Sequence, residues 1–150
     1  MNRCKDVKIS LLAFAWLLVW GCGMAENTIV QPKPPENVKD LAVGDESRQL
    51  DADVKEFVRG KYTIASARYF QVPGDVTWAS ISRSVQNQMQ EKSIPRVMLE
   101  WYEPGIDFVE TYPQGKNGGA FAVAMPKGTK SNSDKIVGYY VLSAGTAAKN

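Results

Sequence analysis

The chain has 150 residues, which is room for one domain, since domains usually span roughly 100 to 200 residues. It carries 18 basic and 16 acidic residues, but three of the basic residues and one acidic residue lie within residues 1–21, so the rest has 15 of each and no net charge. A neutral chain without a run of Lys or Arg is not expected to bind nucleic acid, because such binding needs clustered cations.

The first 21 residues have the three parts of a secretory signal peptide. A basic stretch contains Arg3, Lys5 and Lys8, an apolar run of 12 residues spans 9–20, and a small residue follows. A helix of that length is only about 18 Å long, whereas a bilayer has a hydrocarbon core of about 30 Å. We therefore predict that residues 1–21 are a signal peptide that is removed.

The signal peptide ends in Leu18-Val19-Trp20-Gly21-Cys22. With an aliphatic residue three before the cysteine and a small residue directly before it, this segment resembles the lipobox of bacterial lipoprotein precursors; Trp20 is larger than the pattern usually has. The resemblance implies that a diacylglyceryl lipid, with acyl chains of the palmitate type, is attached to Cys22. Gly23 in place of Asp then implies sorting to the periplasmic face of the outer membrane. The alternatives are the outer leaflet of the inner membrane and, after ordinary signal-peptidase cleavage, the soluble periplasm.

The mature chain lacks the residues that most often carry catalysis or bind metals. Cys4 leaves with the signal peptide, Cys22 is blocked by lipid, and the chain has no His. The commonest general base, the usual catalytic thiol and most zinc ligand sets are therefore missing. We predict no disulfide, no metal and no cofactor.

The mature chain is predicted to begin with a tether. Residues 22–44 are polar and contain Pro32, Pro34 and Pro35. Pro-rich segments extend by about 3.1 Å per residue, so such a segment could hold a domain tens of ångströms from the bilayer. We predict that residues 22–44 are a lipid-anchored tether.

Two helices are predicted from the spacing of apolar residues. In residues 45–59 they recur at spacings of four, three and one: Leu50, Val54, Phe57 and Val58. A second helix begins at a capping residue, Asp75 or Thr77, and ends before Pro95. Its apolar residues recur at steps of three, four and four: Trp78, Ile81, Val85 and Met89.

Strands are predicted in segments that are rich in β-branched and aromatic residues and are separated by Gly or Pro: 62–72, 96–102, 106–112, 120–125 and 136–143. Short links between successive strands favour antiparallel pairing. The predicted fold class is α+β, with an antiparallel sheet of four to five strands and one or two helices packed on one face. It forms a single domain of residues 45–145, followed by a flexible tail of residues 146–150.

One pair of carboxylates invites an enzymatic interpretation. If Pro104-Gly105 forms a two-residue turn, Glu100 and Asp107 are diagonal neighbours on one face, about 7 to 8 Å apart, near the separation used by inverting glycosidases. A solvated sheet face whose acids pair with nearby cations explains the same residues. We favour the second interpretation, because a glycosidase needs a deep cleft that a domain of this size rarely provides.

The tyrosines are the best sequence candidates for an interaction surface, because Tyr and Trp are favoured interface anchors. Tyr139 and Tyr140 are adjacent on a predicted strand and point to opposite faces, so at least one leaves the helix-covered side. Together with Tyr102 and Tyr112 they form the candidate surface. The alternative is that these side chains shield the far face of the sheet.

The sequence therefore predicts a non-enzymatic lipoprotein in the periplasm that binds other envelope proteins, as an accessory or assembly factor of a secretion or pilus type of machine. A module that binds a small ligand or cell-wall glycan is the alternative, and a pocket in place of a flat patch would favour it. A hydrolase that uses Glu100 and Asp107 is the weakest of the three hypotheses.

Overall fold

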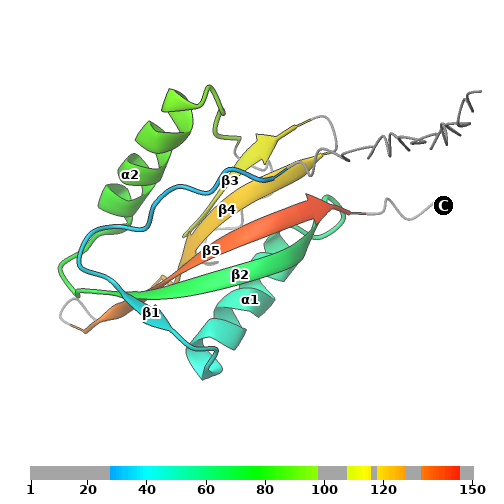
Figure 1. The fold of residues 1–150 in the computed structure, drawn as a ribbon. Coiled ribbons are helices and arrows are strands. Elements are labelled where there is room, and N and C mark those ends of the chain that lie inside the picture. The colour runs from blue at the N-terminus through cyan, green and yellow to red at the C-terminus, as the bar shows by residue number, and fades with distance from the viewer. Residues whose placement is uncertain (1–27, 98–107, 116–117, 128–132, 146–150) are drawn as a thin grey trace, which may run out of the picture.

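The protein folds into one antiparallel sheet with two helices (Figure 1). The computed structural model describes residues 28–97, 108–115, 118–127 and 133–145. The strand order is β1-β2-β5-β4-β3. The elements in chain order are β1 (Lys39–Leu41), α1 (Asp45–Phe57), β2 (Tyr62–Val72), α2 (Trp78–Glu91), β3 (Phe108–Gln114), β4 (Gly119–Met125) and β5 (Lys135–Ala144). The predicted α+β class with an antiparallel sheet is confirmed.

Both helices begin and end close to the predicted residues. At the start of α2 the Thr77 hydroxyl oxygen accepts a hydrogen bond from the Ser80 N–H at 3.2 Å, which is the expected N-cap contact. At the other end Ser93 has a positive φ of 57°, and the helix stops before Pro95. Local capping and apolar spacing therefore define both helices.

The two helices cover opposite faces of the sheet, which corrects the prediction that they share one face. We call these the α1 face and the α2 face. Strand β4 shows the arrangement, since its small residues pack in the α1 cluster and its large ones in the α2 cluster: Ala120, Ala122 and Ala124 against Phe121, Val123 and Met125. A strand buried on both sides has a continuous apolar sequence and no polar alternation.

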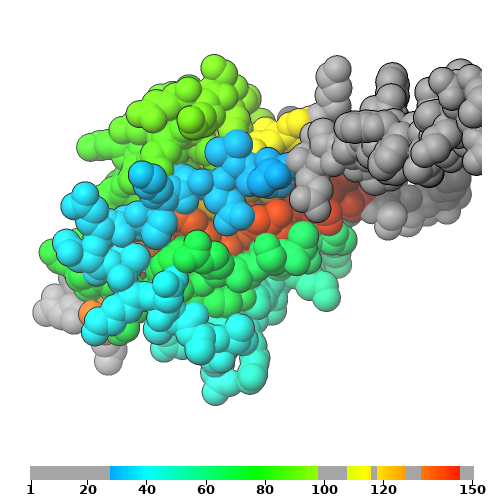
Figure 2. Space-filling model, viewed as in Figure 1, coloured from blue at the N-terminus to red at the C-terminus, as the bar shows by residue number. Residues whose placement is uncertain are grey.

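The segment before β1 lies on the α2 face, between α2 and the β2 edge of the sheet (Figures 1 and 2). The Gln114 side chain accepts from the Val30 N–H at 2.7 Å and donates to the Val30 carbonyl at 2.8 Å. The Gln88 side chain makes the same two contacts with Lys33, at 2.8 and 3.2 Å. Pro32 is buried, so this segment belongs to the fold.

The predicted tether is corrected accordingly. Residues 28–38 are docked on the sheet, and residues 39–41 form β1, which pairs with β2. The physical reason is that two distant glutamine amides and an apolar surface bind a segment whose own sequence is polar and interrupted. Cys22, the start of the tether and the tail of residues 146–150 lie outside the described residues. The predicted strand 96–102 is described only at its start, where Val97 bridges Thr111.

Candidate interaction groove

The tyrosines predicted to form an interaction surface do not do so. Tyr112, Tyr139 and Tyr140 are 0%, 3% and 0% exposed. Tyr139 and Tyr140 do point to opposite faces, but both faces are covered, so neither side chain reaches solvent. Tyr102 lies outside the described residues, as do Glu100 and Asp107. Under the alternative these side chains shield the far face of the sheet; instead both faces are covered, and the three tyrosines that can be placed lie in the core.

Asp51 of α1 joins its helix to the sheet on the α1 face. Its carboxylate accepts hydrogen bonds from the Tyr69 hydroxyl, at 2.6 and 2.8 Å, and from the Tyr140 hydroxyl at 3.0 Å. The Tyr140 ring lies over Gly138, where a Cβ would approach its atoms to 2.6 Å, so only glycine fits there. Burial, and then the hydrogen bond and charge of Asp51, raise the pKa of Tyr69. The Tyr69 hydroxyl therefore remains a protonated donor.

Glu110 of β3 joins α2 to the sheet on the α2 face, and it is only 7% exposed. Its carboxylate accepts from the Ser82 hydroxyl at 2.7 Å, from the Tyr112 hydroxyl at 2.8 Å and from the Arg96 guanidinium at 3.0 Å. Burial, with a further contribution from Glu110, raises the pKa of Tyr112. The cluster joins α2, the segment at Arg96 and β3.

In both clusters the polar side chains already have partners within the protein. Within the described part of the chain, every buried side-chain nitrogen and oxygen has a hydrogen-bond partner, and no three His, Cys, Asp or Glu side chains gather as metal ligands. Both carboxylates already accept several hydrogen bonds from the protein. Their chemistry is to hold the helices on the sheet.

Among the described residues, nothing pairs with the outer edge of β2 along more than half of its length. Strand β1 pairs only with residues 69–71 of β2, whereas β5 pairs with β2 along its whole length. No described strand pairs with the outer side of residues 62–68. A bulge at Ala65, between Ile64 and Ser66, interrupts this stretch. Strand edges of this kind present unpaired N–H and C=O groups and are the usual place where a partner strand adds.

A groove of about 800 Å³ lies beside this open edge, between β2 and α1. We call it the edge groove. Its wall and floor come from α1, from the turn that follows it and from the start of β2: Arg48, Asp51, Ala52, Lys55, Glu56, Arg59, Gly60, Tyr62, Thr63 and Ile64. Exposed Ala52 gives the helix side a low, smooth surface between charged neighbours. The groove therefore combines open backbone, apolar floor and charged rim.

The charges of the edge groove are biased toward cations. Arg48, Lys55 and Arg59 face Asp51 and Glu56. Asp51 is engaged by two tyrosine hydroxyls, and Glu56 pairs with Arg59 at 3.0 Å. Among the described residues no salt bridge involves Lys55, so its exposed ammonium is available to a partner.

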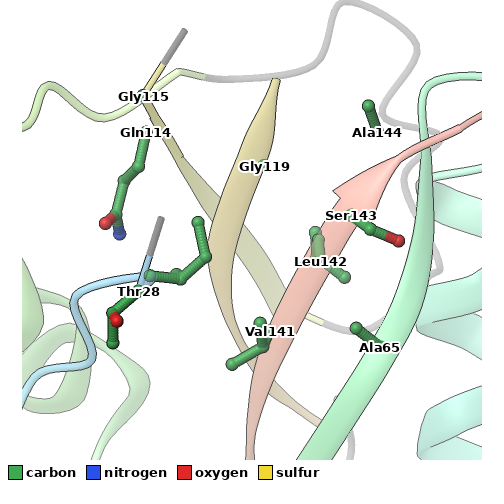
Figure 3. A pocket seen from close by; sticks show the side chains of 10 residues that line it. Thr28, Ala65, Gln114, Gly115, Gly119, Val141, Leu142, Ser143 and Ala144 are labelled. Atoms are coloured by element: carbon green, nitrogen blue, oxygen red, sulfur yellow. The ribbon is translucent and has the colours of Figure 1, made fainter. Parts of the chain in front are cut away.

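A second hollow, of about 530 Å³, lies on the α2 face at the end of the sheet where the described chain begins (Figure 3). We call it the open-end hollow. Thr28 and Ile29 border it on one side, β3 and β4 at their turn on another, and β5 and β2 complete it. The Gln114 amide in its wall is bonded to Val30, and the Ser143 hydroxyl to Thr63 at 2.7 Å.

Sequence reasoning did not locate either hollow. The edge groove depends on the strand order, which leaves β2 next to a strand of only three residues. The one local signal is a run of short side chains, Ala65-Ser66-Ala67, in the middle of a long strand. The open-end hollow depends on the docking of residues 28–38, for which the local sequence carries no signal.

Comparisons of the chain with protein-family models, with curated proteins and with solved structures find no match. Among the described helices, neither combines the length and the apolar character needed to cross a membrane. The function proposed below therefore rests on the geometry of the described residues and on the sequence of the first 22.

Proposed function

We propose that the chain is a lipoprotein, anchored through Cys22 on the periplasmic face of the outer membrane, which binds an extended segment of another envelope protein in the edge groove. It acts as a non-enzymatic accessory or assembly factor. The observation that carries the proposal is the open edge of β2 at residues 62–68, which lies beside a groove of about 800 Å³.

Backbone pairing supplies the affinity in this kind of recognition. A strand added to β2 satisfies main-chain groups that otherwise face water, and its alternate side chains enter the adjacent groove. The bulge at Ala65 blunts the edge against indiscriminate pairing, as bulges do on natural sheet edges. A partner must therefore match both the bulged edge and the shape of the groove, which favours a specific protein over a second copy of this chain.

The charge of the groove selects the kind of segment. Because Lys55 is exposed and the two groove acids are engaged by other groups, the rim favours a partner segment with acidic side chains. Rim charges of this type steer association and fix register more than they add affinity. Binding is thus expected to weaken as salt is raised.

The same geometry speaks against the glycan alternative. Sugar recognition needs convergent polar groups that are free to bond hydroxyls. In the open-end hollow the Gln114 and Ser143 side chains are bonded to the protein itself, and in the edge groove Asp51 is bonded to two tyrosines. A backbone edge is a better match for a peptide.

Filling the groove tests the proposal. Ala52→Trp places an indole in the edge groove from an exposed helix position, so the fold should tolerate it. Ala79→Trp, at an exposed position of α2, is the matched control. After mild detergent extraction of the tagged full-length chain, the original protein and Ala79→Trp should retain the same co-purifying envelope protein, and Ala52→Trp should lose it. Recovery of the original protein alone, as a monomer, would contradict the proposal.

A further inference from the structure

The open-end hollow lies close, along the chain, to the proposed lipid. Thr28 in its wall is six residues after Cys22. A fully extended chain spans about 3.3 to 3.6 Å per residue, so Thr28 can be no more than about 20 Å from Cys22. The docking of residues 28–38 on the sheet removes the longer spacer that would otherwise separate domain and bilayer.

The surface of the hollow is suited to hydrocarbon. Ile29 and Val141 are half-buried side chains in its wall, and Ala65 and Ala144 are exposed at its margin. The polar side chains Gln114 and Ser143 already make hydrogen bonds within the protein, so an occupant of the hollow does not need to supply hydrogen-bonding groups for them. An apolar occupant therefore removes apolar surface from water without stripping unpaired polar groups of their hydration.

The same end of the sheet carries an exposed cation. The Gly145 N–H donates to the Lys61 carbonyl at 2.9 Å, which places Lys61 beside the end of β5. Lys61 itself is exposed. A lysine at this position can meet anionic lipid headgroups while the neighbouring hollow meets the acyl region.

We infer that the open-end hollow is a lipid-contact site, which rests on the bilayer that holds the Cys22 anchor and takes up an acyl chain of a bilayer lipid. This inference rests on the proposed anchoring at Cys22. It gives the domain a fixed orientation: the end with Thr28 and Ala144 faces the membrane and the opposite end faces away. The edge groove, whose Thr63 pairs with Ser143, starts at the membrane end and runs along the side.

Single thiols can test the contact, because an acylated Cys22 has no free thiol and Cys4 leaves with the signal peptide. Ser143→Cys places an exposed thiol at the hollow, and Asp75→Cys places an exposed thiol at the opposite end of the sheet, between β2 and α2. Each full-length variant is labelled with a fluorophore. It is then reconstituted in phosphatidylethanolamine–phosphatidylglycerol vesicles that carry a nitroxide on the acyl chain or, in parallel, on the headgroup.

The acyl-chain nitroxide should quench most of the emission at position 143 and little of it at position 75. Equal quenching at both positions, or quenching at 143 by the headgroup nitroxide alone, overturns the lipid-contact site. The mass of the N-terminal peptide, measured on the same samples, separates the two proposals. An acylated Cys22 with equal quenching leaves the anchor standing, whereas an unmodified N-terminus overturns both.

Discussion

The α1 face and the α2 face are covered in different ways. On the α1 face one helix packs over β2, β5 and β4, and the edge groove stays open beside it. On the α2 face the helix packs over β3 and β4, and the docked residues 28–38 cover the remainder as far as the open-end hollow. Among the described residues the two larger hollows therefore differ in character: a charged groove of about 800 Å³ lies on the α1 face and an apolar hollow of about 530 Å³ on the α2 face.

The carboxylates that join the two helices to the sheet also differ in burial and in their partners. Glu110 on the α2 face is buried and pairs with a guanidinium as well as two hydroxyls. Asp51 on the α1 face is half-buried, borders the groove and accepts hydrogen bonds from two tyrosine hydroxyls. The α2 face is therefore expected to depend more on its carboxylate.

Alkaline pH should unfold the protein and so tests the core of both faces together. Burial raises the pKa of Tyr69, Tyr112 and Tyr139 above the ordinary value of 10.0. Because the folded pKa values are the higher ones, the tyrosines contribute their full stability below pH 10 and lose it as pH rises toward those values. Circular dichroism and tyrosinate absorbance should change together. Tyrosines that ionise near pH 10 in a chain that keeps its fold would contradict this.

Substitutions of Glu110 and Asp51 measure how much the stability of each face depends on its carboxylate. Glu110→Ala leaves the hydroxyls of Tyr112 and Ser82 without their acceptor, at about 1 to 3 kcal/mol for each buried group, and it also removes the ion-pair partner of the exposed Arg96. Asp51→Ala removes the acceptor of the buried Tyr69 hydroxyl and one hydrogen bond of Tyr140, which costs about 1 to 3 kcal/mol. Urea unfolding measures both free energies. If Asp51→Ala is the more destabilising variant, the ranking of the two faces is wrong.

Elements could be predicted from the sequence where local pattern decides them. The boundaries of β2 were predicted as they are found, and both helices within a few residues, because apolar spacing and capping are local properties. In the sequence, only the unbroken apolar runs of β4 and β5 indicate that both faces of the sheet are covered. A strand with one face in solvent would alternate apolar and polar residues.

The candidate site depended on contacts that are distant in sequence. Residues 28–38 are polar and rich in proline, and they become part of the fold through Gln88 and Gln114, which lie more than 50 residues away, and through the apolar surface of the α2 face. The open edge of β2 follows from a strand order that places β5 on its other side. No periodicity or motif records such a pairing.

Loosening the docked segment should have a smaller effect, confined to the α2 face. Gln88→Ala and Gln114→Ala each remove two hydrogen bonds to residues 28–38, with a cost of about 1 kcal/mol per variant in global stability. Amide hydrogens of that segment should exchange faster. Gln49→Ala, which removes one exposed contact with Asp53 on α1, is the control and should leave this exchange unchanged. Faster amide exchange across the whole sheet would contradict this prediction, because it would mean that residues 28–38 do not open independently of the sheet.

A photo-crosslinking residue at position 52 reports what occupies the edge groove of the full-length chain in the cell, and so shows whether this groove binds another envelope protein. Irradiation should give one discrete crosslinked product with another envelope protein from position 52, and none from position 79 on α2. The product should also decrease when Lys55→Glu reverses this charge of the rim. No product at position 52, or the same product from both positions, would contradict the assignment of this groove as the protein-binding site.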